Sequence, residues 1–310
     1  MRIAVIGAGP MGGILAANLI NRGLDVSLVD LNPQIKEQVE KSGLAIVGEA
    51  ATKMQGELQT APVTVASDLA ELGEVDLVFV CIKSTFLHQL IPVMEKCWRS
   101  GTVVVSYQNG IDTEDMLAKV AGDDHTLRVV INYAGQMNSP GIYQVNWVTP
   151  PNYLGGISEL ATATHGQRVA ELLNGAGIEC KLVDKIKQFA FEKTVLNTTL
   201  CPICTLTGLT MGEAMELDAT SSLVRVMLEE ARVIGEHLGY QFKGSINQWM
   251  GYLSVGGNHR TSMAEDINAG RCSEIAFMNG KICDYGELLG VQTPYNNTMR
   301  ALILGREANL

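Results

Sequence analysis

The sequence predicts an α/β protein in which a Rossmann-type, doubly wound parallel sheet is followed by an all-helical C-terminal domain. Up to about residue 183, short apolar segments of strand length alternate with segments of helical period, which is the pattern of parallel strands joined by crossover helices. From Lys185 onward the helical pattern stands almost alone. A length of 310 residues also fits two domains. We therefore expect an α/β domain over residues 1–183 and a helical domain over residues 184–310.

The expected elements follow one another closely along the chain. Strands are expected at residues 2–6, 26–29, 77–82, 102–106, 127–133, 142–147 and 153–157. Apolar residues at helical spacing mark two N-terminal helices, from Ile14 to Ile20 and from Leu87 to Met94. The segment from Gly43 to Ser67 interrupts this rhythm with alternating apolar and polar residues and predicts a hairpin insertion. Helices of the second domain are expected at residues 189–206, 214–238 and 265–289.

Composition and charge exclude several classes of protein. Hydrophobic residues make up 46% of the chain and charged residues 18%, which is enough apolar surface for a large core. The formal charge of −10 opposes binding to nucleic acid. The longest apolar runs have the length of strands rather than of membrane spans. Seven scattered cysteines and the lack of a signal peptide predict reduced thiols in a cytoplasmic protein.

The segment Gly7–Gly12 reads G-A-G-P-M-G and fits the pattern G-x-G-x-x-G. It directly follows the first strand and opens a helix, which is the context in which this pattern binds a dinucleotide. The first glycine permits a tight turn, the second lets the backbone approach a pyrophosphate, and the third lets the helix pack on the sheet. The positive end of the helix then faces the phosphates. The residues expected to contact the cofactor here are Gly7, Gly9, Pro10, Met11 and Gly12.

Asp30 stands at the end of the second strand, 21 residues after Gly9. A carboxylate here accepts hydrogen bonds from the adenosine ribose hydroxyls and repels a 2′-phosphate. No Arg or Lys occurs between Leu31 and Gln34, although Lys36 is near. The favoured cofactor is therefore NAD rather than NADP. The alternative is that Asp30 only caps the following helix.

A nicotinamide cofactor implies hydride transfer, and a carbonyl that accepts a hydride also needs a proton donor. Lys193 and Asn197 are four residues apart in the expected helix 189–206, and they share one face of it. Because their sequence neighbours are largely apolar, a lysine and an asparagine here are unfavourable unless they line a cleft. The general-acid interpretation of Lys193 therefore stands against the alternative of a solvated helix surface.

Taken in order, these motifs resemble those of the ketopantoate reductase family, the 2-dehydropantoate 2-reductases, over essentially the whole chain. Besides the glycine loop, the matching motifs are Lys83 in C-I-K, Gln108-Asn109-Gly110, Lys193-x-x-x-Asn197, Ser262-Met263 with Asp266-Ile267, and Glu274 followed by Asn279-Gly280. The resemblance implies a Rossmann domain, a helical domain and a substrate cleft between them. It also implies reduction of a 2-oxo acid to the (R)-2-hydroxy acid.

The resemblance further implies roles for single residues. Lys193 is implied to be the general acid, with Glu274 as its partner in the active site. Asn197 and Ser262 are implied to hold the substrate. The simpler explanations are that Glu274 is only an acid in the first turn of a helix and that Ser262 is only an N-cap.

Two further residues are implied to lie beside the nicotinamide end of the cofactor, Lys83 and Asn109. Lys83 follows an expected strand, and ligands of open α/β sheets bind at the carboxyl ends of the strands. The simpler explanation for Asn109 is that it forms only a turn with Gly110.

Several positions depart from the family pattern. Members that reduce ketopantoate typically use NADPH and carry a basic residue after the second strand, where this chain has Asp30. They also usually carry pocket asparagines at positions that here fall on Cys201, Met211 and His259. A thiol and a thioether remove hydrogen bonds to the substrate and leave apolar room. We therefore count Cys201 and His259 among the substrate-contacting candidates and expect an apolar 2-oxo acid.

Other reactive residue types lack the pattern of a site. Cys201 and Cys204 have C-x-x-C spacing, but they fall on an expected helix and no second pair exists, which disfavours a redox or zinc role. The five histidines show no ligand spacing, and no metal site is expected. The apolar stripe from Leu223 to Ile234 predicts either core or a dimer interface, so a homodimer stays open.

The sequence therefore predicts an NADH-dependent 2-oxo acid reductase, a D-2-hydroxyacid dehydrogenase with a small-molecule substrate and no nucleic-acid or membrane partner. One alternative is a 2-dehydropantoate 2-reductase proper, which reduces ketopantoate with NADPH. A β-hydroxyacid dehydrogenase also pairs a glycine loop with Lys and Asn four apart, but its glycine-rich substrate motif is missing here. A non-catalytic dinucleotide sensor would need Asp30 and the glycines but not Lys193.

Overall fold

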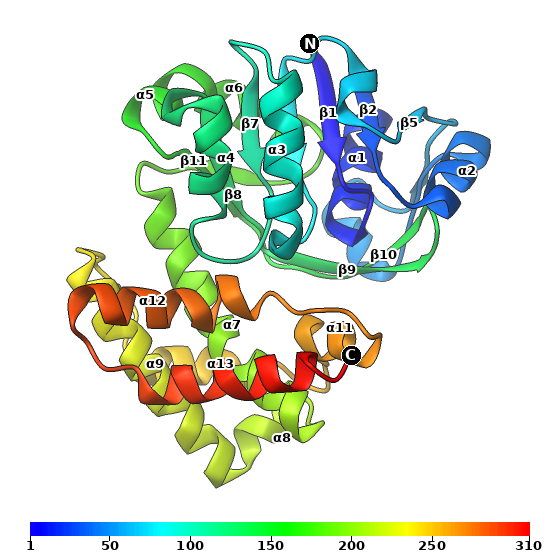
Figure 1. Cartoon of the computed structure of the whole chain (residues 1–310). Helices are drawn as coiled ribbons and strands as arrows, with labels where there is room; N and C mark the ends of the chain where they lie inside the picture. Colours follow the sequence, from blue (N-terminus) through cyan, green and yellow to red (C-terminus); the bar gives the residue numbers. More distant parts are fainter. The chain divides into compact units, whose positions relative to one another are not determined.

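The computed structural model describes all 310 residues, and the chain divides into two compact units, Met1–Lys187 and Gln188–Leu310. Helix α7 (Ile186–Thr207) begins in the first unit and continues into the second. The predicted boundary after residue 183 lies in the loop just before this helix. The units run from blue to green and from green to red in Figure 1.

The N-terminal unit is built on an eight-stranded sheet of order β12-β11-β8-β7-β6-β1-β2-β5. The strands from β8 to β5 are mutually parallel, which confirms the Rossmann-type prediction. β11 runs antiparallel to β8 and was not predicted to do so. The strands are β1 (Arg2–Ile6), β2 (Asp25–Val29), β5 (Val65–Ala66), β6 (Leu77–Val80), β7 (Val103–Ser106), β8 (Thr126–Val130), β11 (Asn152–Gly156) and β12 (Cys180–Leu182).

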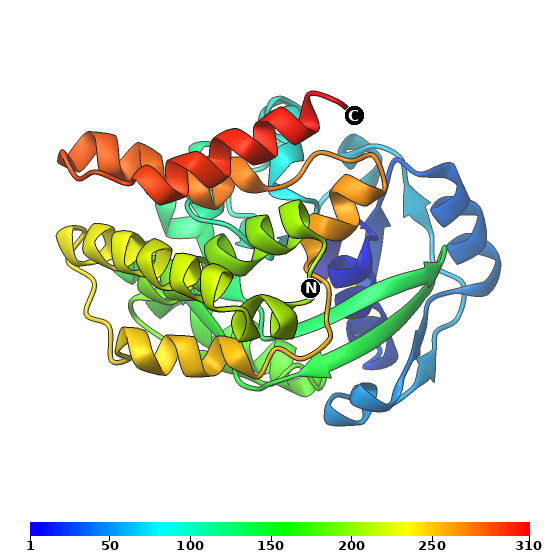
Figure 2. The same cartoon turned by 90° about the horizontal axis from the view of Figure 1, so that it is seen from below.

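A second, four-stranded sheet has the order β4-β3-β10-β9. Its strands are β3 (Ala45–Val47), β4 (Leu58–Gln59), β9 (Tyr133–Ser139) and β10 (Ile142–Val148). The predicted hairpin insertion is present as the antiparallel β3–β4 pair, and the β9–β10 hairpin completes the sheet. Helix α1 (Pro10–Asn21) packs against strands of both sheets (Figure 2).

The predicted single strand over residues 127–133 is wrong. The chain leaves the main sheet after Val130, and Tyr133 already belongs to β9 in the second sheet. Asn132 fixes this corner, because its N–H donates to Asn152 Oδ1 at 2.7 Å and its side chain donates to the Pro151 carbonyl at 2.7 Å. An apolar run alone does not reveal such a change of sheet.

The other helices of the N-terminal unit cover the main sheet, and α3 and α4 pack side by side (Figure 1). They are α2 (Pro33–Ser42), α3 (Leu87–Cys97), α4 (Thr113–Ala121), α5 (Glu159–Ala161) and α6 (Gln167–Gly175), with a π-helical turn at Thr162–Gly166. Short 3₁₀ turns occur at Glu49–Lys53, Leu69–Leu72, Ser84–Phe86, Asp123–His125 and, in the C-terminal unit, Ile275–Phe277.

The C-terminal unit is all-helical, as predicted. Besides α7, its helices are α8 (Met211–Glu216), α9 (Asp218–His237), α10 (Ile246–Ser254), α11 (Ser262–Asn268), α12 (Asn279–Leu289) and α13 (Pro294–Glu307). α9, α12 and α13 pack on one another. No helix of either unit combines the length and apolarity that a membrane span requires.

Two of the predicted helices are broken in the structure. The helix over 214–238 is two helices, because Leu217 is extended (ψ 118°) and the Thr220 hydroxyl donates to the Ala214 carbonyl that the break frees. The helix over 265–289 is also wrong, because Gly270 (φ 71°) ends α11 in a left-handed turn. Apolar periodicity continues across both breaks and hides them.

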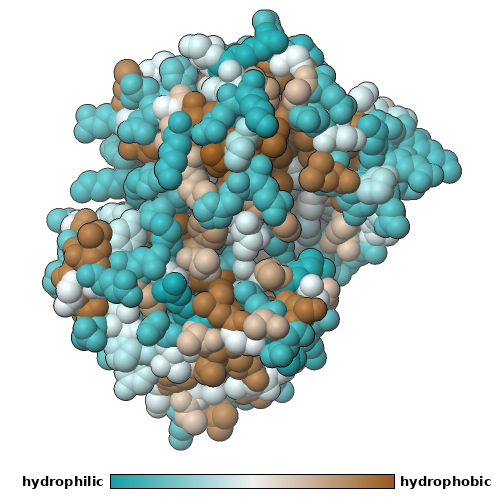
Figure 3. Space-filling model, viewed as in Figure 1, coloured by the Kyte–Doolittle hydropathy of each residue, from teal (hydrophilic) through white to brown (hydrophobic).

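The apolar stripe on α9 is core, since Met227, Ala231 and Ile234 are fully buried. Exposed apolar side chains occur instead on α12 and α13, at Leu288, Leu302 and Leu304. Brown patches are visible in the lower part of the face in Figure 3. A homodimer stays a prediction, which light scattering in solution would test.

Candidate active site

The glycine loop lies at the carboxyl end of β1. Gly7 has a φ of 94°, a left-handed conformation that favours glycine, and a Cβ there would lie 2.8 Å from Ile82 Cγ2. Gly9 is the N-cap of α1, with Pro10 following in the first turn, and no side chain caps this helix. The N–H groups of the first turn therefore lack a side-chain acceptor, which is the arrangement that binds anions.

The first turn of α1 is packed closely from two sides. A Cβ on Gly12 would overlap the carbonyl oxygen of Gly7, and a Cβ on Gly13 would overlap the ring of Tyr143. The buried Tyr143 comes from β10, and its hydroxyl donates to the Ala8 carbonyl at 2.7 Å. Sequence reasoning missed Tyr143, because it is 135 residues from Ala8 and alternation in a strand marks it only as a core residue.

Asp30 holds the other peptide group of Ala8. Its Oδ2 accepts the Ala8 N–H at 2.7 Å, and its Oδ1 accepts the Asn32 N–H at 2.8 Å. The cap of α2 is Asn32, whose side chain accepts from the Gln34 N–H at 2.9 Å. The alternative that Asp30 only caps a helix is therefore wrong. Asp30 fixes the Ala8 N–H while Tyr143 fixes the Ala8 carbonyl, so the loop is held on both sides.

The sheet brings the residues after β6 and β7 to the same edge as the glycine loop. β6 lies between β1 and β7, and all three strands are parallel, so Lys83 and Asn109 both follow carboxyl ends of neighbouring strands. The side-chain amide of Gln108 donates to the Ile82 carbonyl at 2.7 Å and ties the two loops together. The backbone at Gly110 does turn, with a φ of 105°. This edge is where open α/β sheets bind ligands.

Lys193, Asn197 and Cys201 follow one another along α7 at intervals of four residues, about one turn each, so the shared face predicted for Lys193 and Asn197 is present. Cys201 is 6% exposed. It belongs to an apolar cluster whose other members are Met263, Ile275, Met278 and Ile303. At this position the chain presents a buried thiol instead of an amide.

Thr261 and Glu274 lie close enough to Cys201 to affect its ionisation. Burial raises the pKa of the Cys201 thiol to about 12; the charges of Cys204 and Glu274 add to this rise, and a hydrogen bond with Thr261 opposes it. Thr261, and not Ser262, caps α11, since its hydroxyl accepts from the Ala264 N–H at 3.4 Å. The alternative that Ser262 is only an N-cap is therefore wrong. Sequence reasoning missed Thr261, although it directly precedes a matched motif.

Glu274 directly precedes the 3₁₀ turn Ile275–Phe277, and α12 begins only at Asn279. The preceding residue, Ser273, donates its N–H and its hydroxyl to Glu307 Oε1 at 2.7 and 2.6 Å. Because Glu307 belongs to α13, the backbone that carries Glu274 is fixed by a distant helix.

Met211 and His259, two positions that depart from the family pattern, lie next to each other. The Met211 N–H donates to the His259 carbonyl at 3.1 Å, and the Gly212 N–H donates to the Gly257 carbonyl at 2.8 Å. The loop before α11 therefore runs along the start of α8.

The C-x-x-C pair has the properties of core thiols. Burial raises the pKa of Cys204 to about 11, opposed by a backbone hydrogen bond, and all seven cysteines are free. Thiols that stay protonated at neutral pH are poor nucleophiles and poor metal ligands. No group of three or more His, Cys, Asp or Glu side chains in the structure is arranged to hold a metal ion.

The N-terminal unit is of Rossmann type, and its glycine loop leads into a helix whose N-terminus has no side-chain cap. Together with the helical unit that follows, this is the architecture of a dinucleotide-binding oxidoreductase. Two family models identify it further. Residues 3–155 match the model described as "Ketopantoate reductase PanE/ApbA", and residues 185–307 match its C-terminal counterpart. The chain belongs to the ketopantoate reductase family.

Similar proteins agree with this assignment. A 2-dehydropantoate 2-reductase of Mesorhizobium japonicum is 27% identical, over 98% of this chain and 97% of its own. The crystal structure of a PanE/ApbA family ketopantoate reductase from Ralstonia eutropha has a TM-score of 0.89 at 24% identity, covering 100% of this chain and 99% of that one. D-Mandelate dehydrogenase with NADH and anilino(oxo)acetate has a TM-score of 0.86 at 22% identity, with the same coverage.

Proposed function

We propose that this protein uses NADH to reduce a 2-oxo acid with an apolar side chain to the (R)-2-hydroxy acid. The observation that carries the choice of NADH is Asp30, whose carboxylate lies at the end of β2 and binds the Ala8 N–H of the glycine loop at 2.7 Å. A negative charge fixed there opposes a 2′-phosphate and accepts ribose hydroxyls. No basic residue occurs between Leu31 and Gln34 to offset it.

The glycine loop fits a dinucleotide pyrophosphate. A Cβ on Gly9 would meet no atom within 4 Å, so the protein itself does not need a glycine at this position. A glycine here has a reason if a ligand approaches the backbone closely. The uncapped start of α1 supplies the N–H donors that phosphate oxygens need.

When bound, NADH supplies the hydride for the substrate carbonyl carbon. Lys193 Nζ donates the proton to the carbonyl oxygen, and Glu274 is the partner of Lys193 in the active site. Asn197 and Ser262 hold the substrate by hydrogen bonds. Lys83 and Asn109 hold the nicotinamide end of the cofactor. These roles rest on the family resemblance and on the shared face of α7 and the shared sheet edge.

The preference for an apolar substrate is supported by the surroundings of Cys201. A protonated thiol in an apolar cluster is a weak hydrogen-bond donor and cannot replace both the donor and the acceptor of an asparagine amide. Met211 and His259, the other two altered pocket positions, lie next to each other. The similar structure of D-mandelate dehydrogenase, solved with NADH and anilino(oxo)acetate, supports the proposal of NADH and an apolar 2-oxo acid.

The second candidate is reduction of ketopantoate with NADPH; the names of the relatives, 2-dehydropantoate 2-reductases, favour its substrate. Rates of NADH and NADPH oxidation with ketopantoate, a branched aliphatic 2-oxo acid and benzoylformate separate the two candidates. We expect NADH with one of the apolar acids to give the highest kcat/KM. If NADPH with ketopantoate is fastest, Asp30 and the altered pocket have been misinterpreted. No turnover with any pair would favour a dinucleotide sensor.

Replacing Tyr143 by phenylalanine is expected to raise the Kd for NADH about 3- to 10-fold with little change in kcat. Burial and the charge of Asp30 raise the pKa of Tyr143, so its hydroxyl stays protonated and donates to the Ala8 carbonyl. Loss of one such bond is worth about 1 kcal/mol, which loosens the loop. Fluorescence titration with NADH measures the effect. An unchanged Kd would show that Tyr143 does not order the loop.

A further inference from the structure

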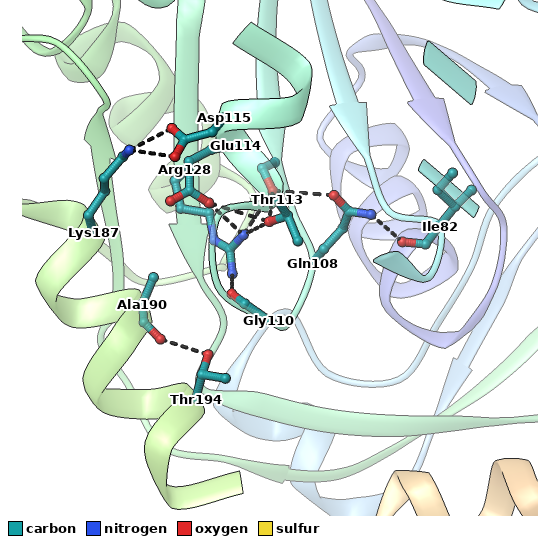
Figure 4. A network of polar contacts seen from close by, with 11 residues as sticks. Ile82, Gln108, Gly110, Thr113, Glu114, Asp115, Arg128, Lys187, Ala190 and Thr194 are labelled. Carbon is teal, nitrogen blue, oxygen red and sulfur yellow. Dashed lines mark hydrogen bonds and ion pairs between the residues drawn. The ribbon is translucent and has the colours of Figure 1, made fainter. Parts of the chain in front are cut away.

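Behind the edge of the sheet that carries Lys83 and Asn109 lies a buried ion pair. Arg128 on β8 and Glu114 on α4 are 2% and 1% exposed, and the distance from Arg128 Nη1 to Glu114 Oε2 is 3.0 Å. Asp115, the residue after Glu114 in α4, forms a second ion pair with Lys187 (Figure 4). Both side chains of this second pair are more than a third exposed. Burying two charges carries a large desolvation penalty. An exposed pair carries little penalty and contributes little.

The guanidinium of Arg128 donates hydrogen bonds to the loop between β7 and α4 and to the residues at its two ends. Its Nη2 donates to the Gly110 carbonyl at 3.0 Å, and its Nη1 donates to the hydroxyls of Ser106, at 3.0 Å, and Thr113. Ser106 ends β7, Gly110 lies in the turn after Asn109, and Thr113 begins α4. The contacts of Arg128 with Gly110 and Thr113 are drawn in Figure 4. One guanidinium therefore fixes the whole turn, which the planar fork of an arginine can do and the single ammonium of a lysine cannot.

The same contacts continue to the loop that carries Lys83. The Ser106 hydroxyl lies 3.3 Å from Gln108 Oε1, and Gln108 Nε2 donates to the Ile82 carbonyl at 2.7 Å. Ser106 and Gln108 are both buried. Arg128 is thus linked by two side chains to the residue directly before Lys83.

The turn that Arg128 holds has an unfavourable backbone. Gly110 has a φ of 105°, and Asp112 is the only non-glycine residue of the chain with a positive φ, 60°. Left-handed conformations at non-glycine residues persist where the surroundings enforce them, and they cluster at ligand sites. The buried guanidinium binds the Gly110 carbonyl and the Thr113 hydroxyl, on the two sides of Asp112.

We infer that Arg128 is a positioning residue for hydride transfer, holding the Asn109 turn and the Ile82–Lys83 backbone in the geometry that the reaction needs. Glu114 orients the guanidinium and balances its charge with a carboxylate 3.0 Å away. The inference rests on the proposed function, because it takes Lys83 and Asn109 to be the residues beside the nicotinamide. A shift of about 1 Å in such groups is enough to slow a reaction about 100-fold.

Three variants test this role in the full-length protein. Arg128→Lys keeps the charge but loses the fork. Gln108→Met removes the contacts of Gln108 with the Ser106 hydroxyl and the Ile82 carbonyl and leaves Arg128 in place. The double variant Arg128→Met/Glu114→Leu replaces the ion pair by apolar groups of similar size, a change that buried pairs often tolerate. We expect kcat per folded molecule to fall about 10- to 100-fold in both Arg128 variants and about 3- to 10-fold in Gln108→Met.

Two further readouts separate positioning from stability. The primary isotope effect with NADH deuterated at the transferred hydrogen should rise in all three variants, because a misplaced loop slows the hydride step itself. Hydrogen exchange of residues 81–84 and 107–112 should become faster. The control Asn152→Ala, on β11, removes one hydrogen bond accepted from the Asn132 N–H and one donated to the Glu179 carbonyl. It should lower Tm and leave kcat and the isotope effect unchanged.

The outcomes are distinct for the two proposals. Wild-type kcat, isotope effect and loop exchange in the folded Arg128 variants would overturn the positioning role while the reaction stands. A wild-type protein that reduces no 2-oxo acid would overturn the proposed function. In that case, hydrogen exchange of residues 81–84 and 107–112 still tests whether Arg128 orders the two loops. If exchange is no faster in any of the three variants, the ordering role of Arg128 is overturned as well.

Discussion

Replacing Lys193 by alanine is expected to lower kcat about 10²- to 10⁴-fold while the Kd for NADH stays nearly unchanged. The reason is that a positioned general acid contributes about this much to a proton transfer. The glycine loop and Asp30, which we propose bind the dinucleotide, belong to the N-terminal unit and are intact in the variant. Steady-state rates with the preferred 2-oxo acid and a fluorescence titration with NADH measure the two quantities separately.

The pH profile gives a second test of the same role. A lysine that acts as an acid must be protonated, so wild-type kcat should fall at high pH as Lys193 loses its proton. The alanine variant should lack this fall. Glu192→Gln, a charge change at the adjacent position of α7, is the matched control and should keep both rate and profile. An unchanged rate in Lys193→Ala would end the general-acid proposal and favour the dinucleotide sensor.

Local patterns in the sequence were sufficient to predict the nucleotide-binding half of the candidate site. Gly7–Gly12 and Asp30 follow adjacent strands, and a βαβ unit of parallel strands necessarily brings such residues to one edge. The direct contact of Asp30 with Ala8 is a consequence of that topology. The same argument predicted Lys83 beside them, since β6 extends the sheet. Asn109, which follows β7, was expected there only from the family resemblance.

The groups that hold this edge in place could not be predicted in the same way. Tyr143 reaches the loop from a second sheet, and Arg128 reaches Gly110 from a strand of which every residue is buried. In the sequence, Tyr143 occurs in an alternating segment and Arg128 between apolar residues. Both patterns predict a strand in the core but do not identify the contact partner. Their roles depend on contacts between segments distant in the chain, which neither spacing nor periodicity encodes.

The helical unit shows a further limit of periodicity. The pattern predicted the all-helical character correctly, but it joined separate helices across Leu217 and Gly270 and did not predict α10 or α13. The second break matters for the site, because it creates the loop that carries Glu274 and lets Ser273 bind Glu307. A helix through this region would have given Glu274 different neighbours.

Replacing Gly9 by alanine is expected to weaken NADH binding about 10- to 100-fold without lowering Tm. The φ of Gly9 is −66°, which any residue adopts, and its Cβ would meet no protein atom within 4 Å. The free protein therefore accommodates alanine. In the complex the methyl group would take the space that we assign to the pyrophosphate, and the loss corresponds to about 1.4–2.8 kcal/mol of binding free energy. Calorimetric titration with NADH and a thermal melt measure the two effects.

Gly12→Ala is the matched variant with the opposite signature. Its Cβ would overlap the Gly7 carbonyl oxygen and lie 2.9 Å from the Cys81 Cβ, so the first turn of α1 must move before any ligand binds. Overpacking of this kind costs about 1–3 kcal/mol, and we expect a clearly lower Tm together with lost NADH binding. If Gly9→Ala binds NADH as tightly as the wild type, the open space at Gly9 is not the pyrophosphate site. The assignment of the glycine loop to the dinucleotide then fails, because Gly9 is its one glycine that the protein's own packing does not require.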